Sequence, residues 1–158
     1  MDISQEELTT GKILHFDKPL GWTSFQLVKK IRYLTKAKKV GHAGTLDPLA
    51  TGVLIICLGK ATKKIEELQL LPKVYTGIIT LGATTPCFDL EQEIDATYPT
   101  DHITDEQIHA TTTQFTGTIQ QTPPAFSAVK VKGRRAYDIA REGNVPEINS
   151  REAQIASF

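Results

Sequence analysis

The sequence has little cysteine, no net charge and no long apolar run, and each shortage excludes a class of protein. Its two cysteines, Cys57 and Cys87, are too few and too far apart for a metal quartet or a disulfide scaffold, so we expect two reduced thiols. No segment approaches the ~20 apolar residues of a membrane span, and the first residues carry acids where a secretory signal has a basic start. We therefore expect a soluble, cytoplasmic protein.

Charge is balanced in total but unevenly distributed. The 18 Lys and Arg residues equal the 18 Asp and Glu residues, which by itself argues against a nucleic-acid-binding protein. However, residues 18–39 hold seven bases and no acid, whereas residues 74–129 hold acids and no Lys or Arg. A second basic run, KVKGRR, supplies Lys130, Lys132, Arg134 and Arg135. Such segregation creates a local positive field, although solvated surfaces without a partner explain the charges equally well.

The pattern of elements predicts an α+β fold: a mixed, largely antiparallel sheet flanked by helices. The length of 158 residues and the 40% hydrophobic content suit one compact domain, and no repeat or linker divides residues 1–158. Strands are expected over residues 11–19, 51–62, 73–85, 119–133 and from 149 onward, and an exposed excursion over 89–102. Helices are expected after Thr23 or Ser24, with Leu27, Val28, Ile31 and Leu34 as the apolar stripe, and over residues 60–72, 104–117 and 134–143.

One acid stands alone in the loop VGHAGTLDPLATG of residues 40–52. Asp47 before Pro48 is typical of a turn, because an Asp carboxylate accepts backbone N–H groups nearby. A carboxylate nucleophile also needs small flanking residues and a fixed backbone, and Gly44, Thr45 and Gly52 meet that need. A phosphate-cradling loop is a further alternative, but the Gly-Lys-Ser/Thr ending of a P-loop is absent.

Four sequence blocks resemble the TruB-type tRNA pseudouridine synthases, in that family's order and spacing. They are KPLGWTS (18–24), GHAGTLDPLATG (41–52), KVYTGIITLG (73–82) and QTPPAFSAVKVKGRRAYDIAREG (121–143). The resemblance implies a pseudouridine synthase catalytic domain that isomerises one uridine in the T-arm loop of tRNA after the base has left its stack. It also implies a monomer whose partner is tRNA, with no cofactor and no metal.

The same resemblance assigns roles to individual residues. It makes Asp47 the nucleophile, attacking ribose C1′ or uracil C6, and Tyr75 the residue that stacks on the flipped base and helps to remove the C5 proton. Lys18 and Pro19 then support the loop, and His42 enters the RNA loop. Gly44 and Thr45 belong to the same substrate-binding set, and Lys130, Lys132, Arg134 and Arg135 contact phosphates.

Each assignment has a plainer alternative. Tyr75 also fits an ordinary strand aromatic, His42 a histidine that caps a turn, Lys18 a partner of a surface acid, and residues 130–135 a basic hairpin. As a whole, the chain also fits a non-catalytic RNA-binding module.

Two departures from the family pattern affect these expectations. Where many members have a Thr-x-Thr-x-Asp run, this chain has ATTPCFDLEQEID, so the role of Asp89 is open. In the family, the catalytic domain continues through a strand whose arginine pairs with the nucleophilic aspartate, and usually to an RNA-binding domain. We therefore expect residues 1–158 to be the N-terminal part of the catalytic domain, able to bind RNA weakly but not to turn it over.

Overall fold

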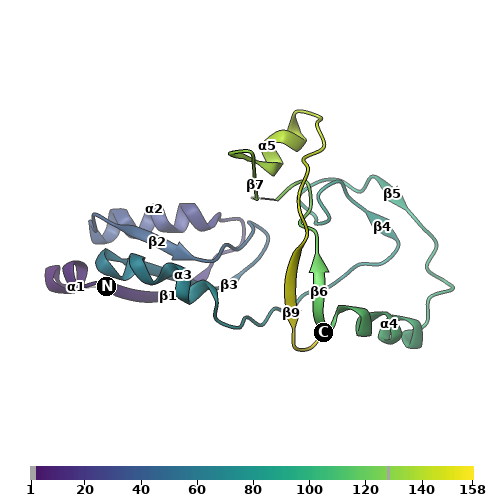
Figure 1. Cartoon of the computed structure of the whole chain (residues 1–158), viewed down its shortest axis with the longest axis horizontal. Coiled ribbons are helices and arrows are strands. Elements are labelled where there is room, and N and C mark those ends of the chain that lie inside the picture. The colour runs from purple at the N-terminus through teal and green to yellow at the C-terminus, as the bar shows by residue number, and fades with distance from the viewer. Residues whose placement is uncertain (1–2, 128) are drawn as a thin grey trace. The chain divides into compact units, whose positions relative to one another are not determined.

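The chain divides into two compact units at Gly77. The computed structural model describes residues 3–127 and 129–158, and the units are Met1–Gly77, here the N-terminal unit, and Ile78–Phe158, here the C-terminal unit. Figure 1 labels their helices and strands. The assignment of residues 1–158 to one catalytic domain stays a prediction.

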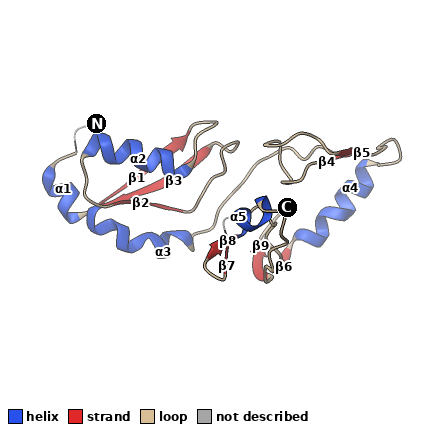
Figure 2. Ribbon diagram, turned by 90° about the horizontal axis from the view of Figure 1, so that it is seen from above, coloured by secondary structure: helices blue, strands red, loops and turns tan. Residues whose placement is uncertain are grey.

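The N-terminal unit is a three-stranded antiparallel sheet with helices on both faces. The strands are β1 (Lys12–Lys18), β2 (Val40–Ala43) and β3 (Gly52–Leu58), in the order β1-β3-β2. The helices are α1 (Gln5–Thr10), α2 (Ser24–Thr35), the 3-10 helix η1 (Gly59–Lys64) and α3 (Ile65–Gln69). Figure 2 shows α2 and α3 on opposite sides of the sheet.

The central strand β3 is covered on both faces over its C-terminal part, whereas Val53 near its start is exposed. Leu54, Ile56 and Leu58 belong to the core that includes apolar side chains of α2, whereas Cys57 points to the other face and is also fully buried. On that second face, Gly41 of β2 pairs with Cys57, and a Cβ on Gly41 would lie 2.7 Å from Cδ1 of Ile65 in α3. A strand covered on both faces has a continuous apolar run, so the prediction of a buried strand here is confirmed.

Helix α2 begins where its sequence predicts. The hydroxyl of Thr23 accepts from the backbone N–H of Gln26, and the Gln26 side chain accepts from the Thr23 N–H, which forms a capping box. Leu27, Val28 and Ile31 are buried, as expected for the core stripe. The inclusion of Leu34 in that stripe is wrong, because its side chain is 61% exposed in the last turn before the helix ends at Thr35.

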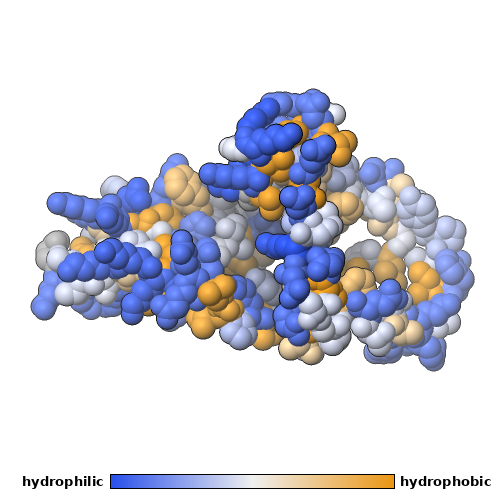
Figure 3. Space-filling view, in the orientation of Figure 1, coloured by the Kyte–Doolittle hydropathy of each residue, from blue (hydrophilic) through white to orange (hydrophobic). Residues whose placement is uncertain are grey.

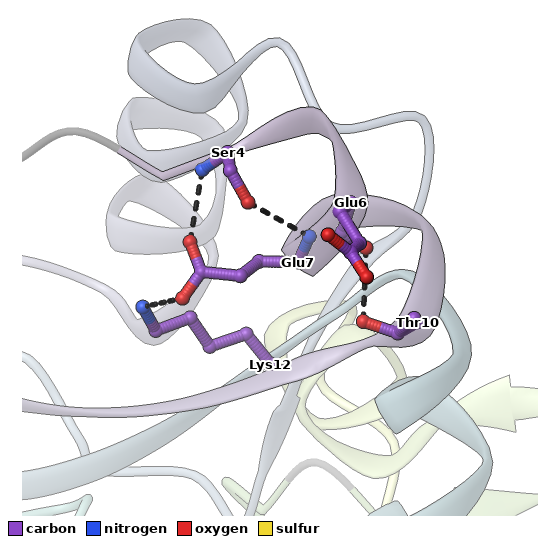
Figure 4. Close-up of polar contacts among 5 residues, drawn as sticks. All are labelled: Ser4, Glu6, Glu7, Thr10 and Lys12. Atoms are coloured by element: carbon purple, nitrogen blue, oxygen red, sulfur yellow. Dashed lines mark hydrogen bonds and ion pairs between the residues drawn. The ribbon is translucent and has the colours of Figure 1, made fainter.

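Helix α1 begins with a second capping box, whose glutamate also joins the helix to strand β1 (Figure 4). Ser4 accepts from the Glu7 N–H, and Glu7 accepts from the Ser4 N–H. The other carboxylate oxygen of Glu7 lies 2.5 Å from Nζ of Lys12 at the start of β1. This hydrogen bond from Lys12 favours the ionised carboxylate and so lowers the pKa of Glu7.

The C-terminal unit consists of short antiparallel pairs and two helices. The pairs are β4 (Ala83–Thr84) with β5 (Ala96–Thr97), β6 (Gly117–Gln121) with β9 (Arg151–Ile155), and β7 (Lys130–Val131) with β8 (Arg134–Arg135). The helices are α4 (Asp105–Thr112), followed by the 3-10 turn η2 (Thr113–Phe115), and α5 (Ala136–Arg141). Among the described residues, the buried aliphatic, aromatic and cysteine side chains lie in the N-terminal unit, apart from Ala136.

The strand expected over residues 73–85 is wrong for most of its length. Only Ala83 and Thr84 pair with another strand, and Val74 and Ile78 are 93% and 96% exposed. A strand requires a partner for its backbone N–H and C=O groups, and residues 73–80 form no ladder with any described residue. Apolar composition therefore does not suffice to make this segment a strand.

The strand expected over residues 119–133 is limited to the ends of that range, in β6 and β7, and several other expectations agree with the structure. Helices beside antiparallel strands confirm the α+β class, and the capping box of Thr104 and Gln107 is present at the start of α4. Cys57 and Cys87 are free thiols, and burial raises the pKa of Cys57 because it disfavours the thiolate. None of the helices in residues 3–127 and 129–158 has the length and apolar character that crossing a membrane requires.

The burial of β3 predicts different losses in the free energy of unfolding for two neighbouring substitutions. Leu54 is 1% exposed and Val53 is 69% exposed, so Leu54→Ala removes packed methyl groups whereas Val53→Ala does not. We expect Leu54→Ala to lower the free energy of unfolding by about 2–5 kcal/mol, and Val53→Ala by less than about 1 kcal/mol. Urea titration followed by fluorescence of Trp22, the single tryptophan, measures both. Equal losses would show that the face of β3 is assigned wrongly.

Candidate active site

A buried lysine lies at the end of β1. The Lys18 side chain is 0% exposed, and its Nζ donates to the carbonyl oxygens of Pro19 at 3.0 Å, Trp22 at 2.6 Å and Pro48 at 3.4 Å. Burying an ammonium group is costly unless its N–H donors are paired, and three carbonyls match its three donors. The alternative in which Lys18 pairs with a surface acid is therefore wrong, because this side chain joins the turn after β1 to the loop that carries Asp47.

The loop of residues 44–52, here the Asp47 loop, is attached at three further points. Pro48 O also accepts from the Gly21 N–H at 2.8 Å. Leu46 exchanges hydrogen bonds with the Ser24 hydroxyl, and the Gly52 N–H donates to Asp17 at 3.0 Å. Gly44 and Gly52 have φ of 87° and 117°, which side chains rarely adopt, so the chain needs glycine at both ends of the loop.

Asp47 combines a fixed backbone with a free side chain. Its carbonyl accepts from the Ala50 N–H at 3.0 Å, so the turn expected at Asp47-Pro48 is present. The Asp47 carboxylate does not form this turn: it is exposed, and no hydrogen bond or ion pair joins it to another described residue. The carboxylate oxygens therefore face solvent, where a substrate can reach them.

His42 lies in β2 and not in a loop, which corrects the expectation. Its Nδ1 contacts the carbonyl oxygen of Gly44 at the start of the Asp47 loop. Because a carbonyl only accepts, Nδ1 carries the proton, and Nε2 remains available to another partner. The histidine ring thus has a fixed orientation beside the loop.

Tyr75 has no such attachment. It lies in the unpaired segment 73–80, is 71% exposed, and forms no ring contact or hydrogen bond with the described part of the chain. Hydrogen bonds thus join several predicted residues around the Asp47 loop, and Tyr75 is not among the residues that they join. The residues that lie in or beside the Asp47 loop are Lys18, Pro19, His42, Gly44, Thr45 and Asp47.

At the other end of the sheet, lysines surround a cavity of about 470 Å³, here the lysine cavity. Its lysines are Lys36, Lys38, Lys39, Lys60 and Lys63, and its lining contains no acid and no aromatic residue. None of the five pairs with a side chain among the described residues. Lys12, at the start of β1, pairs with Leu58, which precedes the cavity residue Gly59, and Lys18, at its end, pairs with Gly52 of the Asp47 loop. The length of β1 at ~3.4 Å per residue therefore places the lysine cavity and the Asp47 loop about 20 Å apart.

The N-terminal unit as a whole is basic. It contains twelve Lys and Arg residues and seven acids, whereas the C-terminal unit contains six and eleven. Hydrophilic side chains cover much of the face of the N-terminal unit that Figure 3 shows. The positive field expected from the sequence is therefore a property of this unit.

The second basic run forms a hairpin. Lys132 and Gly133 connect β7 to β8 with φ of 49° and 86°, the positive pair that a type I′ turn requires. Two of its cations are near acids: Lys132 lies 3.9 Å from Glu147, and Arg134 lies 2.5 Å from Glu142. Glu142 raises the pKa of Arg134 further above its usual value. Lys130 and Arg135 are exposed on the same hairpin.

Comparison with known proteins identifies the family. Residues 32–158 match the TruB family pseudouridylate synthase (N terminal domain). The chain belongs to this family. It is 60% identical over 147 residues to tRNA pseudouridine synthase B of Phocaeicola vulgatus, a match that covers 89% of this chain and 63% of that protein. With tRNA pseudouridine synthase B of Flavobacterium johnsoniae it shares 54% identity over 163 residues, covering 99% and 71%.

A solved structure is similar to this chain of the TruB family. A chain of a Cbf5-Nop10-Gar1 complex superimposes with a TM-score of 0.53 at 30% identity, over 80% of this chain and 32% of that chain. The chain spans about 63% of the length of the Phocaeicola vulgatus relative. It is therefore the N-terminal part of the family fold.

The sequence does not predict some of the contacts that hold the loop in this member of the TruB family. Ser24 is predicted only as a helix cap, yet it holds the Asp47 loop, and Asp17 is not predicted at all. Lys60 and Lys63 complete the lysine cavity from η1, and their basic run GKATKK was a signal available in the sequence. In residues 3–127 and 129–158, no group of three or more His, Cys, Asp or Glu residues is placed to hold a metal ion.

The buried Lys18 ammonium predicts a large effect of its removal. Lys18→Met removes the ammonium donor that the Pro19, Trp22 and Pro48 carbonyls share, and although Pro19 and Pro48 each keep one backbone N–H donor, the Trp22 carbonyl loses its bond of 2.6 Å, so we expect the free energy of unfolding to fall by about 2–3 kcal/mol. Lys30→Met, at an exposed position on α2, serves as the control and should change stability by less than about 0.5 kcal/mol. Urea unfolding monitored by Trp22 fluorescence compares them. If the two variants unfold at the same urea concentration, Lys18 does not support the loop.

Proposed function

We propose that this sequence supplies the nucleophile of a tRNA pseudouridine synthase that acts on a uridine in the T-arm loop. The observation that carries the proposal is the Asp47 loop, in which an exposed carboxylate without a partner stands on a backbone held at Leu46, Pro48 and Gly52. The substrate class is supported by the relatives, which are tRNA pseudouridine synthases at 54–60% identity.

The reaction is an isomerisation, so its atoms balance without a co-reactant. The N1–C1′ bond of uridine breaks, a C5–C1′ bond forms, C5 loses a proton and N1 gains one. Asp47 attacks either ribose C1′ or uracil C6, and the carboxylate is regenerated when the product forms. Such a nucleophile acts best when its approach is fixed in advance, which is the property that the attached loop provides.

The base must leave its stack to reach Asp47, because a uracil within a folded loop is covered on both faces. We propose that Tyr75 stacks on the flipped uracil and helps to remove the C5 proton, and that its exposed ring is available for this role. We propose that His42 fills the space which the flipped nucleotide leaves. The contact of Nδ1 with Gly44 O supports this role, because it fixes the ring beside the loop.

RNA is held mainly through its phosphates in this proposal. The lysine cavity presents five ammonium groups that pair with no described side chain, and its lining has no aromatic residue, so it suits a phosphate backbone and not a base. The hairpin residues Lys130, Lys132, Arg134 and Arg135 supply a second set of phosphate contacts, for which Glu142 and Glu147 compete. We further propose that the protein acts as a cytoplasmic monomer without a cofactor, and that turnover needs the part of the family fold that the relatives have beyond this match.

Asp47→Asn tests the nucleophile. A chimaera of this chain followed by the remaining sequence of the Phocaeicola vulgatus relative supplies the whole family length. In an assay of tritium release from tRNA labelled at uridine C5, we expect Asp47→Asn to lose at least about 10⁴-fold in rate while tRNA affinity stays within about threefold, since an amide is not a nucleophile here. Glu66→Gln is the matched control, since it changes an exposed carboxylate on α3 that has no hydrogen bond to the described residues of the loop. Undiminished release by Asp47→Asn would remove the enzyme proposal.

A non-catalytic RNA-binding module is the second candidate, because the lysine cavity can bind RNA without any chemistry at Asp47. The same assay separates the candidates: a module predicts no tritium release from the unsubstituted chimaera, even though tRNA binds. Full activity of the 158-residue chain alone would instead contradict the proposal that turnover needs the remaining part of the fold.

The lysine cavity predicts a salt-dependent binding defect. Replacing both Lys39 and Lys63 by Glu should weaken tRNA binding by the 158-residue chain at least about tenfold at 0.1 M salt, and should reduce the slope of log K against log salt by about 1–2. Lys64→Glu changes a neighbouring lysine outside the lining and controls for net charge. Fluorescence anisotropy with labelled tRNA measures both quantities. If Lys64→Glu weakens tRNA binding by half as much, in free energy, as the double variant, the loss comes from net charge alone and the cavity is not the RNA site.

A further inference from the structure

Ser24, the first residue of α2, has a buried hydroxyl that bonds to the Asp47 loop. Its side chain is 3% exposed, and it is one of two buried polar residues that the described core contains, the other being Lys18. The Ser24 hydroxyl donates to the Leu46 carbonyl at 3.0 Å and accepts from the Leu46 N–H at 3.0 Å. One hydroxyl thus satisfies both backbone groups of the residue that precedes Asp47.

The Leu46 side chain is fixed as well. It packs against the core cluster formed by α2 and the sheet, so the backbone and the side chain of Leu46 are both held. On the other side of Asp47, the ring of Pro48 restricts its own φ, and its carbonyl accepts from Lys18 and Gly21. Asp47 is therefore placed between two immobilised neighbours while its carboxylate projects to solvent.

We propose that Ser24 is a positioning residue for the nucleophile, which sets the approach of the Asp47 carboxylate by fixing the peptide group on its N-terminal side. This inference rests on the proposed function, because it assumes that Asp47 attacks the substrate. Removal of the hydroxyl takes away the partner of the Leu46 N–H and C=O in a partly buried place, so we expect the loop to shift and expose them to water. A displacement of about 1 Å at a reacting group can cost about 10²-fold in rate.

The neighbouring residue provides a matched control. Thr23, and not Ser24, caps α2: its hydroxyl accepts from the Gln26 N–H, and no hydrogen bond joins the Thr23 side chain to the described residues of the loop. Thr23→Ala therefore destabilises the start of the same helix without touching Leu46. Ser24→Ala keeps that cap and loses only the loop contact, and Ser24→Thr restores a hydroxyl at the same place.

The first measurement is amide hydrogen exchange in the 158-residue chain. We expect the Leu46 amide to exchange at least about tenfold faster in Ser24→Ala, and at an unchanged rate relative to the other amides of the unit in Thr23→Ala and Ser24→Thr. This readout does not depend on catalysis. Unchanged protection of Leu46 in Ser24→Ala overturns the proposal, because the loop then keeps its position without the hydroxyl.

The second measurement is single-turnover tritium release by the chimaera with saturating tRNA. Ser24→Ala should lower the rate constant by about 10- to 100-fold with tRNA affinity within about threefold, whereas Ser24→Thr should recover most of the rate and Thr23→Ala should retain it. A purely structural role would lower Ser24→Ala and Thr23→Ala together, which overturns the proposal.

Asp47→Asn, measured in parallel, separates this proposal from the function on which it rests. An unimpaired rate in Ser24→Ala beside an inactive Asp47→Asn overturns the positioning role alone. An unimpaired rate in Asp47→Asn overturns both, because Ser24 then positions no nucleophile. If the unsubstituted chimaera releases no tritium, the proposed function fails, and the positioning of a nucleophile fails with it whatever the exchange of Leu46.

Discussion

The buried ammonium group of Lys18 is the constraint on which the site depends. A charge without water must keep its hydrogen-bond acceptors, so the carbonyls of Pro19, Trp22 and Pro48 have to converge on one point. These carbonyls come from the turn after β1, the residue before the cap of α2, and the Asp47 loop. Because all three segments share one donor, none of them can move without leaving a polar group unpaired.

The start of α2 divides two tasks between adjacent hydroxyls. Thr23 accepts from the Gln26 N–H in the first turn of the helix, and Ser24 bonds to the backbone of Leu46 in the loop. Leu27, Val28 and Ile31 pack the helix against the sheet, so the loop that is bonded to this helix has a fixed position relative to the core. A surface carboxylate is thereby placed by residues that are themselves buried, which is how an exposed group acquires a defined geometry.

The sequence predicts the features that depend on local signals. The capping boxes at Thr23 and Thr104, the apolar run of β3 and the turn at Asp47 are all encoded within a few residues, and all are present. The strand expected over residues 73–85 fails because strand pairing is non-local. For the same reason local patterns do not reveal the partners of the loop: Lys18 is expected there only from the family resemblance, and Lys18 and Ser24 lie 30 and 22 residues from the loop residues that they hold. The lysine cavity is likewise not predictable from local patterns, because its lysines come from two separate segments.

Strand β3 connects the two ends of the N-terminal unit directly, since Gly52 closes the Asp47 loop and Gly59, after the last residue of β3, lines the lysine cavity. Hydrogen bonds to β1 and β2 on either side prevent the strand from sliding or stretching. The separation of the two places is therefore set by the number of residues in one strand. Under the proposed function, β3 therefore sets the distance between the nucleophile and the RNA phosphates that the lysine cavity would hold.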